Sequence, residues 1–135
     1  MDNNTFLVTV FTMIDDWLKT QAPIRQRGPQ HTLADSEVLT IEVFGSFLGI
    51  SAEEELFKHF RRHYRAWFPL LPTVHRTTFT RQAANLWQVK QRLWQHLLTK
   101  VNYDPRFNIV DSFPVPVCRF ARAYRCKRLR EWSAW

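Results

Sequence analysis

Hydrophobic residues recur at steps of three and four positions through roughly the first hundred residues of the chain. Because such steps place side chains on one face of an α-helix, they predict a series of amphipathic helices. The four predicted helices cover about residues 4–20, 32–49, 51–64 and 77–101. The predicted fold class is therefore mainly α, built on a four-helix N-terminal region.

Residues at the predicted helix ends support these boundaries. Thr32 with Asp35, and Ser51 with Glu54, have the spacing of a capping box, in which the two side chains satisfy backbone amides at a helix start. Gly49 follows the second apolar run, where a glycine can adopt the left-handed conformation that ends a helix. The ends of the second and third helices are thus predicted from local chemistry as well as from periodicity.

The fourth predicted helix has an apolar and a polar side. Trp87 and Trp94 lie seven residues apart on its apolar stripe, so both are predicted to lie in the core. A proline-containing turn joins the third helix to this one, which suggests a helix-turn-helix-like unit, although the connector is longer than a standard turn. The residues predicted to face a DNA groove are Arg76, Thr77, Arg81, Gln82 and Asn85. Such residues can bind phosphates and base edges, and the alternative is an ordinary polar surface.

The pattern changes after Asp104 and Pro105. Residues 107–113 (FNIVDSF) are short, branched and aromatic, which predicts a strand. This change predicts a domain boundary near residue 103. Residues 1–103 would form a helical region, and residues 104–135 would form the beginning of a second domain. Asp111 ends the predicted strand, where a rigidly held carboxylate suits an oxygen-liganded ion such as Mg²⁺. The alternative is that Asp111 is a turn or cap residue.

The formal charge of +7 is concentrated in the back half of the chain. Residues 1–75 hold seven Lys and Arg against nine Asp and Glu, whereas residues 76–135 hold twelve against three. A basic region of this kind favours a polyanionic partner, and nucleic acid is the commonest such partner. Solubility alone is the competing explanation.

Much of this charge lies in one segment near the end of the chain. Aromatic residues alternate with its cations, a combination that can neutralise phosphates and stack on bases. A solvated charged surface is the alternative. The cations assigned to DNA binding here are Arg119, Arg122, Arg125, Lys127, Arg128 and Arg130.

Other residues suggest no further site. Cys118 and Cys126 are the only cysteines, and without a second pair they predict two free thiols rather than a zinc site. His59 and His63 lie one helical turn apart, which is a metal-binding spacing, but no third ligand accompanies them. No long apolar run predicts a membrane span, and the N-terminus lacks the basic start of a secretory signal. A cytoplasmic, nucleoid-associated protein is expected.

Several longer strings resemble the transposases of bacterial insertion sequences. Residues 35–42 (DSEVLTIE), 75–79 (HRTTF) and 81–87 (RQAANLW) carry part of this likeness. Residues 110–118 (VDSFPVPVC) and 119–126 (RFARAYRC) resemble the first-aspartate motif of the insertion-sequence 982 family. The resemblance covers about residues 1–130 and departs from the family pattern from Glu131 onward.

The resemblance implies a DDE transposase, in which an RNase H-like α/β catalytic domain holds two Mg²⁺ ions on three carboxylates. Asp111 matches the first carboxylate, and no position here matches the second or third. The expectation is therefore the N-terminal part of a transposase, with the first strand of a truncated RNase H-like domain. The implied partner is double-stranded DNA at transposon ends, with association of copies or with full-length transposase as a further possibility.

Two other functions remain open at this point. The chain could be a catalytically inactive DNA-binding or regulatory module that competes with the full-length enzyme for transposon ends. It could also be a helical protein-interaction domain with no DNA partner, because the front half is acidic and the predicted core is rich in aromatic residues.

Overall fold

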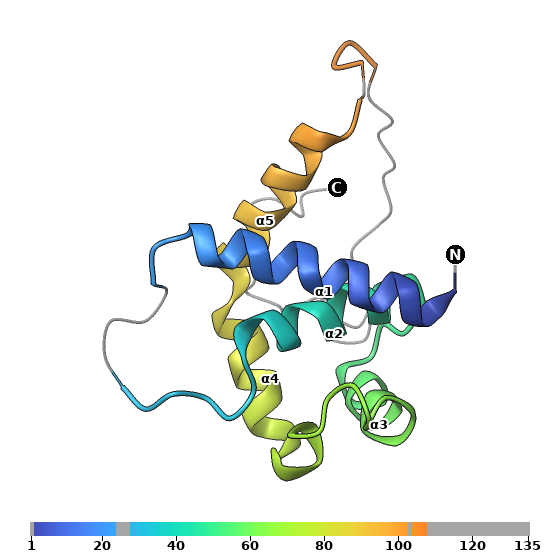
Figure 1. Cartoon of the computed structure of the whole chain (residues 1–135), viewed down its shortest axis with the longest axis vertical. Coiled ribbons are helices and arrows are strands. Elements are labelled where there is room, and N and C mark those ends of the chain that lie inside the picture. The colour runs from blue at the N-terminus through green and yellow to red at the C-terminus, as the bar shows by residue number, and fades with distance from the viewer. Residues whose placement is uncertain (1, 24–27, 103, 108–135) are drawn as a thin grey trace, which may run out of the picture. The chain divides into compact units, whose positions relative to one another are not determined.

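The computed structural model describes residues 2–23, 28–102 and 104–107, and these are mainly α-helical (Figure 1). Five α-helices and one 3₁₀ turn follow one another: α1 (Asn3–Thr20), α2 (Asp35–Phe47), α3 (Glu53–His63), η1 (Leu71–Thr73), α4 (Arg76–Asn85) and α5 (Trp87–Lys100). Residues 1–101 form one compact unit. The predicted strand at 107–113 lies outside the described residues except for Phe107, and none of the described residues forms a strand. Within the described ranges, no helix is long and apolar enough to cross a membrane.

Helices α1 and α2 lie alongside each other and make the most extensive helix–helix contact of this unit (Figure 1). The buried residues of α1 are Leu7, Val10, Ile14 and Trp17. Their spacing of three, four and three residues returns each time to nearly the same side of the helix, as an amphipathic helix requires. The first predicted helix is therefore confirmed in its extent and in its amphipathic character.

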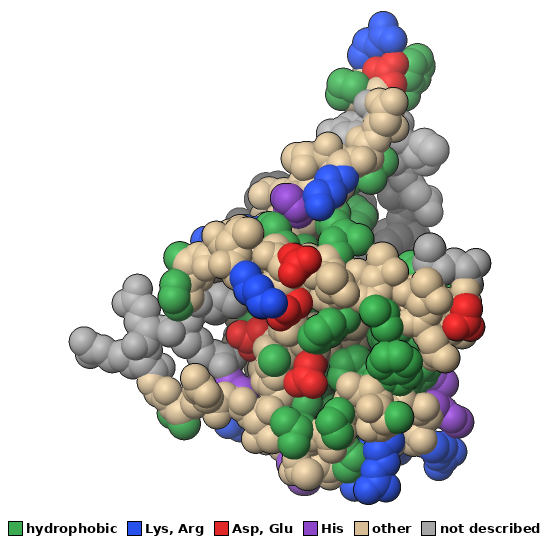
Figure 2. Space-filling view, viewed as in Figure 1, with side chains coloured by type: hydrophobic (Ala, Val, Ile, Leu, Met, Phe, Trp, Pro, Cys, Tyr) green, Lys and Arg blue, Asp and Glu red, His purple; other side chains and the backbone are tan. Residues whose placement is uncertain are grey.

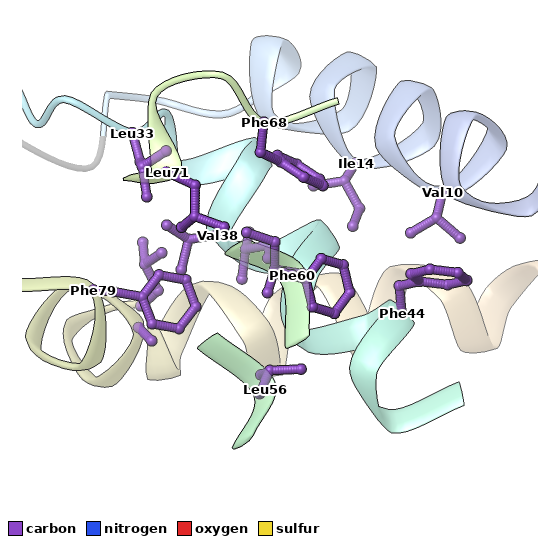
Figure 3. Close-up of a cluster of buried hydrophobic side chains, with 14 of the residues drawn as sticks. Val10, Ile14, Leu33, Val38, Phe44, Leu56, Phe60, Phe68, Leu71 and Phe79 are labelled. Carbon is purple, nitrogen blue, oxygen red and sulfur yellow. The ribbon is translucent and has the colours of Figure 1, made fainter. Parts of the chain in front are cut away.

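An aromatic cluster occupies the space between α2 and α3 (Figure 3). Phe44 is fully buried, and its ring centroid lies 5.8 Å from that of Phe60 and 5.4 Å from that of Tyr64, both in edge-to-face arrangements. Phe6 of α1 completes the group, with its ring centroid 5.8 Å from Phe44. Aromatic pairs in these geometries contribute about 0.5–1.5 kcal/mol beyond their burial. The cluster thus holds α1, α2 and α3 together.

The two ends of α2 differ from each other in how well the sequence predicted them. Gly49 has φ +77°, and the amide of Ile50 donates to the Gly45 carbonyl at 2.9 Å, so the predicted left-handed ending is confirmed. At the start, the capping residue is Ala34 rather than Thr32, and its amide donates to Glu37 Oε2 at 2.9 Å. The prediction that Thr32 and Asp35 form the capping box was wrong, because the side chain of Glu37 accepts from the amide of the capping residue, Ala34.

The predicted fourth helix is two helices, α4 and α5, which are separated by a break at Leu86 (φ −86°, ψ 9°). Leu86, Val89 and Leu93 are buried on the core side. Trp87 and Trp94, by contrast, are 60% and 63% exposed, so the prediction that both lie in the core was wrong. After the break at Leu86, the buried row of α4 continues along α5 with Val89 and Leu93. The side chains of Trp87 and Trp94 lie outside this buried row.

Candidate nucleic-acid interface

The predicted DNA-facing residues lie on α4, and their positions are set by the segment formed by α3, the connecting turn and α4. The Phe57 ring of α3 lies 5.5 Å from the Phe79 ring of α4, which fixes the two helices against each other. The connecting turn is also anchored in the core, since Phe68, Leu71 and Val74 are buried. Helix α4 is therefore presented by a packed turn, although this turn is longer than that of a standard helix-turn-helix.

His75 caps the start of α4. Its Nδ1 accepts a hydrogen bond from the Thr77 amide at 3.3 Å and lies 2.8 Å from the Thr77 hydroxyl. One of the unpaired amides of the first turn is thereby satisfied by a ring nitrogen. This role of His75 was not predicted from the sequence. The one signal in the sequence is a side chain with an acceptor atom directly before a helical run.

Four of the five predicted groove-facing residues are exposed in α4: Arg76, Thr77, Arg81 and Asn85. Thr77, Arg81 and Asn85 follow one another at four-residue steps, so they form one row along the helix. The whole span 76–100 contains no Asp or Glu. A ten-residue helix is about 15 Å long and about 10–12 Å wide with its side chains, and these dimensions fit the DNA major groove.

Gln82 does not belong to this surface, which corrects the sequence prediction. It is 1% exposed, and its side-chain amide donates to the Leu33 carbonyl at 2.9 Å and to Asp35 Oδ1 at 2.8 Å. Position 82 follows Phe79 by three residues and so falls on the core side of α4. Its polar group is accommodated because it satisfies backbone and side-chain acceptors at the start of α2.

The two arginines of α4 differ in their electrostatic surroundings. The pKa of Glu54 is held below its ordinary value, first by its hydrogen bond with Lys58 at 2.7 Å and then by the charges of Lys58 and Arg76. The charge of Arg76 is thus partly balanced by the acidic first turn of α3. Arg81 forms no ion pair in the part of the chain that the structure describes. It is the better placed of the two for an external anion.

Further cations accompany this unit at the end of α3. Arg61 and Arg62 are exposed in its last turn, and Arg65 follows in the connector. Lys and Arg side chains are visible at the end of the molecule where α3 lies (Figure 2). These residues therefore add positive charge beside the turn that leads to α4.

The paired histidines of α3 lie with their ring centroids 4.8 Å apart. Burial, and then the nearby charge of His63, lower the pKa of His59. Across residues 2–23, 28–102 and 104–107, no three His, Cys, Asp or Glu side chains gather as metal ligands would. His59 also packs near the aromatic rings of Phe60 and Tyr64.

The other predicted site residues fall outside the described part of the chain. These are the candidate Mg²⁺ ligand Asp111 and the cations Arg119, Arg122, Arg125, Lys127, Arg128 and Arg130. Their roles stay predictions from the sequence.

Comparisons of this chain with protein-family models, with curated proteins and with solved structures found no match. The chemistry of the exposed α4 surface and the sequence strings described above are therefore the grounds for assigning a function.

Proposed function

We propose that this chain is part of an insertion-sequence transposase and that α4 binds double-stranded DNA at transposon ends. The row formed by Thr77, Arg81 and Asn85 is the observation that carries this proposal. These side chains are exposed on a short helix that follows a packed turn, in a span without acidic residues. The resemblance of the sequence strings to insertion-sequence transposases supports the same assignment.

Each residue of the row has a specific chemistry toward DNA. An arginine can donate two hydrogen bonds to guanine O6 and N7, and an asparagine can pair in the same way with adenine N6 and N7. Thr77 stands at the positive end of the α4 dipole, which favours a phosphate at this position. Arg81 and Asn85 would then read bases, while Thr77 and the cations of α3 would bind the backbone.

Asp111 enters this proposal as a metal ligand of the DDE type. In such a site, Mg²⁺ ions would activate the attacking oxygen and stabilise the leaving oxygen of a phosphodiester. Asp111 is followed by one more acidic residue in the printed sequence, Glu131. DNA binding, rather than strand cleavage, is accordingly the activity that we assign to these 135 residues.

Binding can be measured by fluorescence anisotropy of a labelled random-sequence duplex of about 25 base pairs, titrated at several salt concentrations. We expect affinity to fall steeply with salt, because each bound cation releases a counterion from the DNA. On this pool, Arg81→Ala should lower the salt slope by about one if Arg81 contacts a phosphate. If it contacts a base, the loss of about 1–3 kcal/mol should appear on duplexes selected from the pool for tight binding. Lys19→Ala is the matched control, because Lys19 pairs with Asp15 on α1, at 2.6 Å.

The basic segment at 119–130 requires a separate variant, since it can bind DNA without sequence preference. Replacing Arg119, Arg122 and Arg125 by alanine should lower affinity for all duplexes equally. Arg81→Ala and Asn85→Ala should instead change which sequences are enriched when bound duplexes are selected from the random pool. Absence of wild-type binding at low salt, or unchanged enrichment in both α4 variants, would contradict the proposal.

A further inference from the structure

Two histidines lie close together on the last two turns of α3, outside the surface assigned to DNA. His59 and His63 are four residues apart, so both side chains lie on one side of the helix. Their ring centroids are 4.8 Å apart, with an angle of 46° between the two ring planes. His63 is exposed and His59 is half-buried. Histidine side chains are visible at the surface where α3 lies (Figure 2). The pair is therefore already assembled and can be reached from solvent.

The separation of the two rings matches that of two ligands on one metal ion. An ion about 2.1 Å from one nitrogen of each ring lies about 3.2 Å from each ring centre. Two rings that bind this ion at an angle of about 90–109° then have centres roughly 4.5–5.2 Å apart. The observed distance of 4.8 Å lies within this interval. The backbone of α3 can therefore hold both rings on one ion without rearranging.

Aromatic packing holds the first of the two rings in place. The His59 ring centroid lies 5.8 Å from that of Phe60 and 5.8 Å from that of Tyr64. Tyr64 in turn packs edge-to-face on Phe44 of α2, at 5.4 Å. A ligand that is fixed in advance loses less conformational entropy when it binds. His59 is thus the anchored ligand, and the more exposed His63 is free to turn toward the same ion.

The charges beside the pair are of both signs. Glu55 precedes His59 by four residues and Arg62 follows it by three, so both lie on the same side of α3 as His59. The nearby Lys58 ammonium is bound by Glu54 at 2.7 Å. A carboxylate therefore accompanies the guanidinium of Arg62, and the approach of a cation is not opposed by positive charge alone.

We propose that His59 and His63 together bind one divalent transition-metal ion of the group that imidazole prefers, which includes Cu²⁺, Ni²⁺ and Zn²⁺. This site differs in chemistry from the Mg²⁺ site expected at Asp111, because Mg²⁺ takes oxygen ligands. No third His, Cys, Asp or Glu joins the pair within residues 2–23, 28–102 and 104–107, so water fills the remaining coordination positions. The ion links the last two turns of α3 and stabilises the end of this helix.

Calorimetric titration of the full chain with Ni²⁺, without an affinity tag, tests this site. The background carries Cys118→Ser and Cys126→Ser, which removes both thiols. His59→Gln and His63→Gln should each weaken binding at least about tenfold, because one imidazole holds the ion within reach of the other. His96→Gln is the control and should leave the affinity unchanged, since His96 lies on α5 beside Trp17. Equal Ni²⁺ affinity in the wild type and the His63→Gln variant would overturn the proposal.

A change of spacing tests whether one ion contacts both rings. Adding Arg62→His to His63→Gln places a histidine three residues after His59, on the same side of the helix, and should recover much of the affinity. Adding Arg61→His instead places it two residues after His59, on the other side, and should not. Recovery in both variants, or in neither, would contradict a shared ion.

Two further measurements give independent evidence of the ion. The electron paramagnetic resonance spectrum of bound Cu²⁺ should show coupling to two nitrogens in the wild type and to one in the His63→Gln variant. Excess Ni²⁺ should raise the urea midpoint of the wild type and not that of this variant, because only a bound ion stabilises the folded chain. A single-nitrogen spectrum or an unchanged midpoint in the wild type would contradict the site. None of these tests involves DNA, so failure of this site and failure of the proposed function are separate results.

Discussion

Gln82→Met separates a structural role of Gln82 from the DNA contact that the sequence suggested. Methionine has nearly the length and the helix propensity of glutamine, so the substitution removes the amide with little change in volume. Two hydrogen bonds are lost, at 2.9 Å to the Leu33 carbonyl and at 2.8 Å to Asp35 Oδ1. The variant therefore tests the connection between α4 and the start of α2.

The expected cost follows from the burial of these groups. Leu33 is 1% exposed, and a buried carbonyl that loses its donor costs about 1–3 kcal/mol. The bond to the Asp35 carboxylate adds to this cost, and burial of the more apolar Met side chain offsets part of it. We expect a net loss of about 2 kcal/mol, a large fraction of the stability of a small domain.

Urea unfolding followed by far-ultraviolet circular dichroism measures this loss. With an m-value of about 1–3 kcal/mol per molar urea, the midpoint should fall by roughly 1 M. Gln88→Met, at an exposed position of α5, is the control and should leave the midpoint nearly unchanged. Under folding conditions, the DNA affinity of Gln82→Met should equal that of the wild type. Unchanged stability together with weaker DNA binding would refute the reasoning and return Gln82 to the DNA-facing surface.

Three further substitutions test charge and packing. Burial raises the pKa of Glu42, so the ionised form of its carboxyl costs stability above that pKa. In urea titrations, Glu42→Gln should be more stable than wild type at pH 7 and should lose this advantage as the pH falls below about 4.5. Because the pKa of His59 is lowered in the folded chain, its contribution to the free energy of unfolding is fully present above about pH 6.5 and is lost as the pH falls through the pKa of the folded state. His59→Gln should therefore make stability less dependent on pH, and an unchanged profile of stability against pH would contradict this prediction. A Cβ at Gly45 would clash with Leu56 Cδ1, so Gly45→Ala should destabilise by about 1 kcal/mol, but not in a Leu56→Ala background.

The helical fold and much of its core could be predicted from the sequence. Leu7, Val10, Ile14 and Trp17 lie in a single row of apolar residues on α1, and that row is buried. Gly49 likewise ends α2 as predicted, because the left-handed conformation at a helix end is a local requirement that glycine meets best. Periodicity and end chemistry depend on neighbours close in the chain, so they are readable from the sequence.

The candidate DNA-facing surface was only partly predictable for a related reason. Arg81 and Asn85 are exposed, as a polar row on a helix suggests, but Gln82 is buried. Its acceptors, Leu33 and Asp35, lie almost fifty positions earlier in the sequence. A polar residue that satisfies distant buried groups leaves no local pattern, since only packing brings donor and acceptor together.

Helix α5 shows most clearly what the sequence determined and what the tertiary structure decided. The sequence determined that α5 is helical and that it has enough apolar residues for two stripes. The break at Leu86 and the packing of the unit decided that Val89 and Leu93 would be buried and that Trp94 would remain 63% exposed. Hydrophobicity is a property of each side chain, whereas burial depends on which face meets a neighbouring helix, and that meeting is a long-range event.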